Sequence, residues 1–417
     1  MQNWSKNIDF LEDGYFQPES LGELQEMIIG QRKIRARGTA HSFNSIAVAS
    51  SIGLNLSKMP KTIEVEPKLQ TVRVAAGLTY GEVAPILHEK GWALSNLASL
   101  PHISIAGSIS TATHGSGLTN QNLANQVVSI GIVTSEGELK RIDHNEASFN
   151  GLVVGLGLGA IVYQYELKIE PTYQIRQVVY PEIPINTLQE NFNELMGSAY
   201  SVSYFTDWGS NQTGNLWCKY RDEEQIPDNV GGSLRANSKL HPIPSVDPHA
   251  CTEQDGVKGY WHDRLPHFQL DFTPSVGEEI QSEFFVDIED ASAAIEAVRQ
   301  LSLEITPLLW VTELRTIAAD ELWLSTAYQR NSLGIHFTWK KTDLIFPVIA
   351  KIELALKPFL YRPHWGKVFT ADPTYLTSVY PRMADFKSLI GNLDSNEKFQ
   401  NSFTNSIFKR TEFNREF

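Results

Sequence analysis

A short turn of small residues around one histidine is the segment of this chain best suited to chemistry. Residues 37–44 read Arg-Gly-Thr-Ala-His-Ser-Phe-Asn, and small side chains leave backbone N–H groups open to a phosphate or a cofactor. A second small-residue loop, residues 105–117, follows later and contains His114. Two such loops in one N-terminal region predict two walls of a single diphosphate site, so a bound cofactor is the first hypothesis.

A set of polar residues in the C-terminal half could line a pocket for a polyhydroxylated substrate. Glu313 and Arg315 are two residues apart in an alternating segment, so both project from one face of the predicted strand. His336 and Thr338 repeat this spacing, and Lys367 follows a turn bounded by proline and glycine. Together these side chains offer both the donors and the acceptors that a polyol needs.

Structural explanations of the same residues stay open at this point. Glu313 and Arg315 could form a salt bridge on a solvated strand face. His336, which lies between isoleucine and phenylalanine, could be a structural histidine of a mixed sheet. Lys367 could be a surface lysine, and the two loop histidines could be ordinary turn residues.

Three motifs for other chemistries carry little weight. Residues 155–160 match the dinucleotide pattern G-x-G-x-x-A, which needs a following helix, but residues 161–170 alternate as a strand. We therefore predict no Rossmann fold, and expect these glycines to let backbone pass close to a ligand or a neighbouring strand. The loop at 115–117 lacks the G-x-S-x-G spacing of a serine hydrolase. Zinc ligand types occur in a proline-interrupted run whose spacing matches no common site, at His241, Asp247, His249 and Cys251.

Hydrophobic periodicity predicts the elements that must position these residues. Helices are expected over residues 21–29, 80–90, 291–301, 346–360 and 380–390. Strands are expected over residues 62–66, 71–76, 127–134, 161–170, 201–208, 216–221, 283–287 and 308–314. Pro171 marks a plausible change of domain.

Composition excludes several classes of protein. The 417 residues are 42% hydrophobic and 20% charged, which favours a globular chain with room for two domains. A net charge of −13 argues against nucleic acid and anionic membranes as partners. The sequence shows no apolar run of the roughly twenty residues that a spanning helix needs, no signal peptide and no disulfide framework from its two cysteines. We therefore expect a cytoplasmic protein.

Read together, the motifs resemble those of the vanillyl-alcohol oxidase flavoprotein family, with FAD-linked, PCMH-type domains. Residues 38–44 and 113–117 resemble the broad FAD fold, and residues 100–107 also carry the resemblance. Residues 252–254, 261–268, 312–315 and 362–367 are similar to the polyol-oxidising branch and its close relatives. The resemblance runs nearly from end to end.

This resemblance implies an α+β fold. A two-subdomain FAD-binding domain of the PCMH type is expected over residues 1–175, and a mixed α+β cap with a large antiparallel sheet over residues 176–365. Residues 366–417 are expected to return to the FAD domain.

The cofactor implied is FAD, bound covalently through His41 to the 8α carbon of the flavin. A single link is expected, since neither Cys218 nor Cys251 lies in a flavin motif, and Thr39 departs from the Gly or Arg common there. The implied cofactor-binding residues are Arg37, Gly38, Thr39, Ala40, His41, Ser42, Phe43, Ser104, Gly107, Ser108, Thr111, Ala112, Thr113, His114, Gly115, Ile161 and Lys367.

The reaction implied is oxidation of a terminal CH2OH of xylitol or sorbitol to the aldose, with hydride passing to flavin N5 and O2 reduced to H2O2. Lys367 and Arg315 match residues beside the reacting hydroxyl, where cations stabilise an alkoxide. The residues implied to hold the substrate are Ser104, Glu313, Arg315, His336, Thr338 and Lys367. The proton acceptor stays open between Glu313, His336 and solvent through Lys367.

Two alternatives accompany this reading. A sugar-1,4-lactone oxidase or dehydrogenase shares the fold, and a flavin- or carbohydrate-binding protein without turnover is the alternative from a different class. We expect a monomer whose partners are a small polyol and molecular oxygen, without a metal ion, nucleic acid or membrane.

Overall fold

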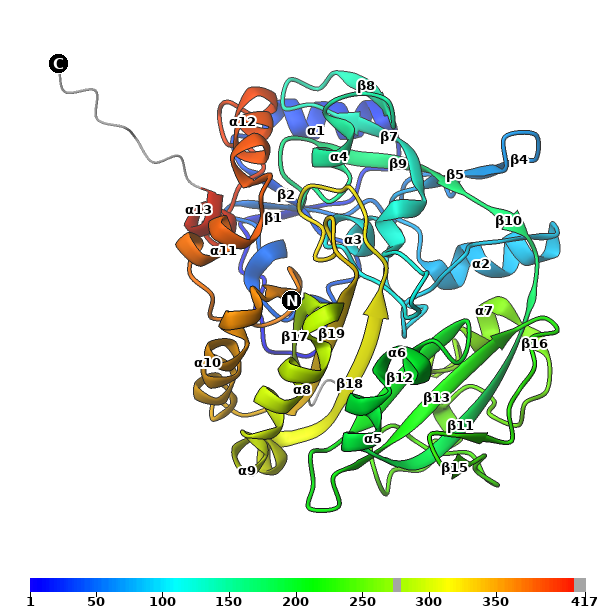
Figure 1. Cartoon of the computed structure of the whole chain (residues 1–417). Coiled ribbons are helices and arrows are strands. Elements are labelled where there is room, and N and C mark those ends of the chain that lie inside the picture. Colours follow the sequence, from blue (N-terminus) through cyan, green and yellow to red (C-terminus); the bar gives the residue numbers. More distant parts are fainter. Residues whose placement is uncertain (273–278, 409–417) are drawn as a thin grey trace.

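The computed structural model describes residues 1–272 and 279–408, which build two sheet systems (Figure 1). Residues of both systems line one cavity. A parallel three-stranded sheet has the order β1-β3-β2, with β1 at Gly14–Phe16, β3 at Ile52–Leu54 and β2 at Ile34–Ala36. An antiparallel five-stranded sheet has the order β4 (Ile63–Glu66), β5 (Thr71–Ala75), β9 (Ile161–Lys168), β7 (Val127–Val133) and β8 (Leu139–Asp143).

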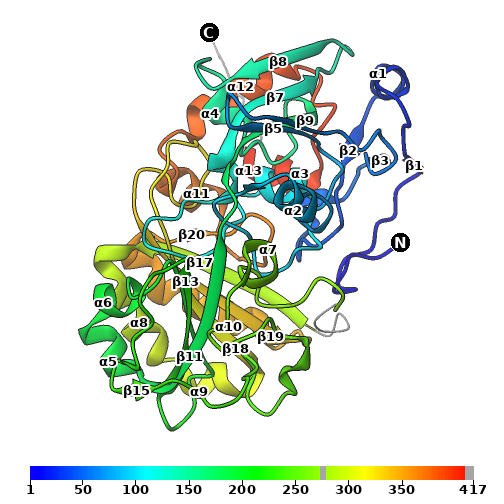
Figure 2. The ribbon, with the colours of Figure 1, turned by 90° about the vertical axis from the view of Figure 1, so that its right-hand side faces the viewer.

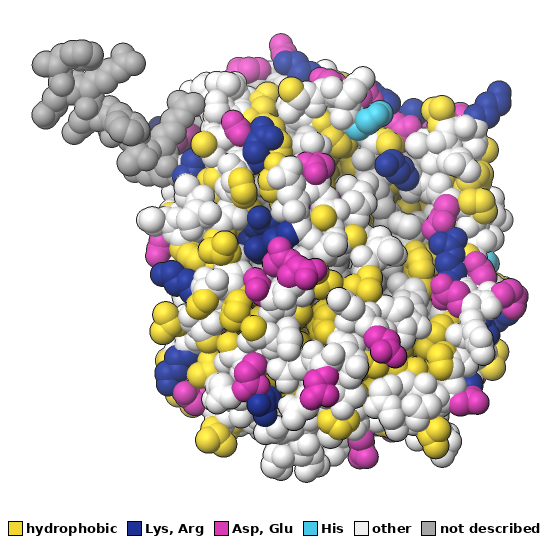
Figure 3. Space-filling model, viewed as in Figure 1, with side chains coloured by type: hydrophobic (Ala, Val, Ile, Leu, Met, Phe, Trp, Pro, Cys, Tyr) yellow, Lys and Arg dark blue, Asp and Glu magenta, His cyan; other side chains and the backbone are white. Residues whose placement is uncertain are grey.

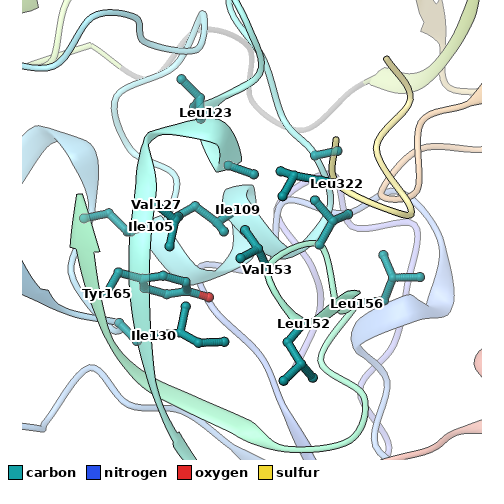
Figure 4. Close-up of a cluster of buried hydrophobic side chains, with 14 of the residues drawn as sticks. Ile105, Ile109, Leu123, Val127, Ile130, Leu152, Val153, Leu156, Tyr165 and Leu322 are labelled. Atoms are coloured by element: carbon teal, nitrogen blue, oxygen red, sulfur yellow. The ribbon is translucent and has the colours of Figure 1, made fainter. Parts of the chain in front are cut away.

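Helices α1 (Leu21–Gly30), α2 (Tyr80–Glu89) and α3 (Ile105–Ser110) lie in the same part of the chain as these two sheets. A capping box between Thr79 and Glu82 starts α2. Figure 4 shows how Ile105 and Ile109 of α3 gather with Ile130 and Tyr165 from the five-stranded sheet, so this short helix is fixed by its apolar side.

An eight-stranded antiparallel sheet forms the second system. Its order is β16 (Gly259–Tyr260), β11 (Gln174–Pro184), β13 (Thr213–Arg221), β12 (Ser201–Thr206), β18 (Leu309–Ile317), β19 (Ser332–Lys340), β17 (Glu279–Asp287) and β20 (Arg362–Pro363). One face packs in a common core with helices of the same region, which are α5 (Ile185–Glu190), α6 (Phe192–Met196), α8 (Ala291–Arg299) and α10 (Ile345–Leu356). Figure 2 shows these helices beside the sheet.

The two-residue period of the strands separates the faces of this sheet. Leu314, Ile335 and Phe337 pack toward the helices, so their neighbours Glu313 and His336 point to the opposite face, which lines the cavity. A register slip of one residue would exchange the two sets, and the apolar core therefore fixes which polar residues reach the cavity.

The C-terminal helices pack against the N-terminal part of the chain. They are α11 (Pro373–Val379), α12 (Met383–Leu393) and α13 (Ser402–Phe408), and their apolar residues share one core with the first two sheets (Figures 1 and 2). Arg35 ties three segments together, because its buried guanidinium donates to the carbonyl oxygens of Ile46, Leu156, Gly157 and Phe399. The domain limits at 175/176 and 365/366 stay predictions.

The α+β class and the large antiparallel sheet are confirmed, while several element limits were wrong. The helix expected over 380–390 begins at Met383, because Pro381 disfavours helical backbone at Tyr380. The helix expected over 346–360 ends at Leu356, before a 3-10 turn that contains Pro358. Strand β17 begins before residue 283, since the polar residues of its cavity face hide the apolar period. The loop expected at 105–117 opens with the helix α3.

Charged side chains of both signs alternate over the face in Figure 3, with no continuous basic stripe among the described residues there. A search of the described helices finds none with the length and apolar character needed to cross a bilayer.

Candidate active site

A cavity of about 570 Å³ lies where the N-terminal loops face the eight-stranded sheet. Its size falls in the range of about 300–1,000 Å³ found for ligand and cofactor sites. Both small-residue loops line it, together with residues 152–162 and the polar face of β17, β18 and β19. Of the predicted site residues, Ala112 and Gly115 are not part of its wall, whereas all the others are.

The two small-residue loops lie directly against each other. A Cβ atom on Gly38 would come within 1.9 Å of the hydroxyl of Ser104, so this contact requires glycine. The Ser104 N–H donates to the hydroxyl of Thr39 at 3.1 Å, and the Ser104 hydroxyl accepts from the N–H of Gly107 at the start of α3. Ala40 has a left-handed φ of 57°, a conformation that costs an alanine free energy and turns the following residue inward.

His41 lies in this turn at the cavity wall, half-buried. Its Nδ1 lies 3.0 Å from the hydroxyl of Thr39, and its ring stacks on Trp4 with centroids 5.6 Å apart. Burial, with a smaller contribution from His102, lowers the pKa of His41 to about 4. The imidazole is therefore neutral at neutral pH and keeps a nucleophilic lone pair.

The loop of His41 is also joined to the turn that carries Lys367. The side-chain amide of Asn44 donates to the carbonyl oxygens of Trp365 and Lys367, and Phe43 N–H donates to that of Gly366. These hydrogen bonds between the two loops fix the position of His41 relative to Lys367.

Strand register places the candidate catalytic residues in rows. On neighbouring strands, His336 of β19 lies opposite Glu313 of β18 and opposite Glu283 of β17. Arg315 lies two residues after Glu313 on β18 and therefore on the same face. Glu313 is 4% exposed and Arg315 is 5% exposed. The two residues do form the ion pair that the structural interpretation expected, but the strand face that carries them is buried at the cavity wall and is not solvated.

Glu283 is the centre of a buried ion cluster. Its carboxylate accepts from Arg315 at 2.8 Å and from Lys367 at 2.7 Å, and it lies 3.2 Å from Nε2 of His114. Burial alone would raise the pKa of Glu283, but Lys367, His114 and Arg315 outweigh it and hold that pKa well below the usual range. Glu283 therefore stays ionised and fixes the two cations at the cavity wall.

Glu313 is the centre of a second buried polar cluster, with His267, Arg315 and His336. It accepts from His267 Nε2 at 2.8 Å, and its other oxygen lies 3.5 Å from Arg315 Nε and 3.9 Å from His336 Nδ1. Burial opposes ionisation here too, yet Arg315 and His267 lower the pKa of Glu313 below its usual range. This carboxylate is a hydrogen-bond acceptor at neutral pH.

His336 has one engaged and one open ring nitrogen. Its Nε2 lies 3.1 Å from Oε1 of Gln281, whose amide nitrogen donates to Glu279 at 2.7 Å. Gln281 therefore presents an acceptor, so Nε2 of His336 carries the proton and Nδ1 carries the lone pair. Nδ1 is buried without a hydrogen-bond partner among the described residues. Burial, then Lys367, keeps the pKa of His336 well below its usual value, so the ring is neutral.

Comparison with known proteins agrees with this geometry. An alditol oxidase from a Streptomyces strain is 40% identical over 97% of this chain and 98% of its own length. The chain belongs to the alditol oxidase family. A model of an FAD binding domain matches residues 13–143, and one of D-arabinono-1,4-lactone oxidase matches residues 272–407. The family's cofactor here is FAD, and the PCMH-type fold predicted from the sequence is confirmed.

More distant relatives and folds widen the comparison. L-gulonolactone oxidase from Mus musculus is 23% identical, over 98% of both chains. Among solved structures, cholesterol oxidase from B. sterolicum superposes with a TM-score of 0.80 at 13% identity, over 98% of this chain and 96% of the other. A solvent-stable cholesterol oxidase gives 0.78 at 14% identity, over 98% and 97%. These structures share the fold of the alditol oxidase family.

Several residues of this alditol oxidase family site were missed by sequence reasoning. Glu283, Gln281 and Lys219 were not singled out from the sequence. His267 and His364 were included only as members of the motifs at 261–268 and 362–367. The available signal was a charged residue within an apolar strand, as in Ser-Glu-Phe-Phe-Val at 282–286 and Trp-Cys-Lys-Tyr at 217–220. Such a charge is costly unless a partner meets it.

The rejected motifs have structural explanations. Gly157 and Gly159 have φ of 69° and 77° in a turn that lines the cavity and leads straight into β9, so the prediction against a Rossmann fold is confirmed. In the other motif, Asp247 caps a 3-10 turn and Cys251 is a buried free thiol. No group of three metal-ligand side chains occurs among residues 1–272 and 279–408.

Proposed function

We propose that this protein is an FAD-dependent oxidase of acyclic polyols, which converts a terminal CH2OH to an aldehyde and reduces O2 to H2O2. The observation that carries the proposal is the group of buried Glu313, Arg315 and His336 with partly buried Lys367, on the wall of the cavity that the flavin-type loops line. Such a group supplies both charged donors and charged acceptors to a substrate rich in hydroxyl groups.

The residues present fit FAD. A cavity of about 570 Å³ is lined by the two small-residue loops and by the polar sheet face, and the contact of Gly38 with Ser104 leaves no room for a side chain where the loops meet. When bound, FAD supplies the hydride acceptor and returns the electrons to O2. The loop residues 37–43 and 104–114 would hold it.

Lys367 and Arg315 would act on the reacting hydroxyl. Each keeps donors beyond those given to Glu283, and two cations beside one oxygen favour the alkoxide over the alcohol. Because Glu283 anchors both groups at 2.7 and 2.8 Å, they are set in place before the substrate arrives.

His336 would accept the proton of that hydroxyl at Nδ1. This nitrogen has the open lone pair, and the tautomer is fixed through Gln281. Glu313 is already engaged by His267 and Arg315, so its role is to hold a substrate hydroxyl. Ser104 and Thr338 stay predicted substrate contacts.

The covalent link to His41 belongs to the same proposal. Its support is the neutral imidazole at the cavity wall, and a single link is expected because neither Cys218 nor Cys251 lines the cavity. We expect acid-precipitated protein to stay yellow and His41→Ala to release its flavin. Flavin found wholly in the acid supernatant of the wild type would refute the link. A cytoplasmic, monomeric state stays a prediction from the sequence.

The deciding experiment compares substrates on the purified holoenzyme. We expect peroxide formation with xylitol and sorbitol at a higher kcat/KM than with aldono-1,4-lactones. Preference for a lactone would establish the alternative suggested by the match at residues 272–407, and a flavin that no polyol bleaches under anaerobic conditions would indicate a binding protein. Lys367→Met should lower kcat by about 10²–10³-fold, whereas the exposed Lys351→Met serves as the matched control.

A further inference from the structure

A chain of buried polar side chains continues from Glu313 through His267, which still lines the cavity, to Lys219, which does not. The Oε1 of Glu313 lies 2.8 Å from Nε2 of His267, and Nδ1 of His267 lies 3.3 Å from Nζ of Lys219. Lys219 also donates to the carbonyl oxygen of Leu265. His267 is 6% exposed and Lys219 is 1% exposed, and Lys219 does not reach the cavity wall.

Lys219 is an unusual residue for this position. It lies on β13 within an apolar stretch, and the described residues place no carboxylate within ion-pair distance of it. Burial lowers the pKa of Lys219 to about 7, with Glu313 opposing and Arg315 adding to that effect. A buried ammonium without a direct counterion costs free energy, so packing alone gives no reason for lysine here.

The direction of each hydrogen bond in this chain follows from the donors available. The ionised carboxylate of Glu313 can only accept, so Nε2 of His267 must donate to it. Nδ1 then accepts from Lys219, which has N–H donors whether it is charged or neutral. Burial, then Lys219, lowers the pKa of His267 to about 4, and the neutral ring therefore carries its single proton on Nε2. That proton points at Oε1 of Glu313.

We propose that Lys219 and His267 are positioning residues that fix Glu313 for the substrate. Lys219 donates to Nδ1 of His267 and so favours the tautomer with its proton on Nε2. His267 then occupies Oε1 of Glu313, which leaves Oε2 as the acceptor for a substrate hydroxyl. Oε2 is also the oxygen nearest to Arg315 and His336. The inference rests on the proposed polyol oxidation, because Glu313 needs a hydroxyl-bearing substrate to hold.

The kinetic test uses substitutions along this chain in the holoenzyme. We expect His267→Met to raise KM for xylitol about tenfold and Lys219→Met to raise it about three- to fivefold, with kcat changed less than threefold, since a binding contact is weakened. His267→Gln keeps an N–H toward Glu313 and should recover most of the loss. Cys218→Ala is the matched control, because Cys218 is the neighbour of Lys219 and packs on the helix-covered face.

Stability separates positioning from a structural role. Lys219→Met removes a buried charge and should leave Tm unchanged or raise it, while KM still rises. Unchanged KM in both methionine variants would overturn the proposal, and so would a KM rise of equal size in Cys218→Ala.

A spectroscopic readout tests the chain without turnover. In 15N-histidine-labelled protein, the His267 signals, assigned by their loss in His267→Gln, should show a protonated Nε2 and a bare Nδ1 at pH 7.5. A proton on Nδ1 would overturn the inference. This measurement stands even if the wild type oxidises no polyol, in which case the proposed function fails by itself.

Discussion

Glu283→Gln keeps the shape of a buried side chain and removes its charge. The carboxylate receives two charge-assisted hydrogen bonds, from Arg315 at 2.8 Å and Lys367 at 2.7 Å. A hydrogen bond to a charged group contributes about 1.5–3 kcal/mol, and loss of one partner of a buried pair costs about 3–5 kcal/mol. We therefore expect the free energy of unfolding to fall by about 3–5 kcal/mol.

The same substitution should also lower activity. Without Glu283 the two cations repel each other and leave their positions beside the reacting hydroxyl, so kcat should fall at least about tenfold. Urea unfolding followed by tryptophan fluorescence measures the first effect, and peroxide formation with xylitol measures the second.

Glu353→Gln is the matched control for this experiment. Glu353 is also a buried glutamate, but it accepts from the N–H of Thr370 instead of a cation, and burial raises its pKa. Its replacement should cost less stability and leave kcat unchanged. Wild-type stability and turnover in Glu283→Gln would refute the reasoning that this carboxylate anchors the two cations.

Two further outcomes are expected from the same structure. Gly38→Ala forces a Cβ to within 1.9 Å of the Ser104 hydroxyl, so the variant should retain little FAD, measured as the 450 nm absorbance of purified protein; full flavin content would contradict the contact. Acid should destabilise the protein between pH 6.5 and 4: the folded-state pKa of His267 is lowered to about 4 from 6.5, so the unfolded chain alone takes up a proton in this window and stability falls by about 3 kcal/mol as pH drops. Urea midpoints at pH 7, 5.5 and 4 measure this loss, and it should shrink in His267→Gln.

Local patterns were sufficient to predict much of the fold and half of the site. The small residues around His41, the alternation at Glu313 and Arg315, and the repeat at His336 and Thr338 each report where a side chain points, because a strand has a period of two. These predictions needed no knowledge of which strand or loop packs against the segment.

What the sequence could not reveal is pairing between distant segments. Glu283 becomes important only when β17 lies beside β19 and the turn of Lys367 folds over it. Lys219 and His267 come from a strand and a loop that meet only in the folded chain. A single sequence contains no signal for such register, which is fixed by the apolar face of the sheet.

The guanidinium of Arg35 has a consequence for biosynthesis. It bonds carbonyl oxygens near residues 46, 156 and 399 at once, so the core beneath the flavin loops is incomplete until almost the whole chain has left the ribosome. In a shorter nascent chain, Arg35 would lack the carbonyl oxygen of Phe399 as a partner. The Arg35 site is therefore complete only after residue 399 has been synthesised, and stable capture of the cofactor has to follow that point.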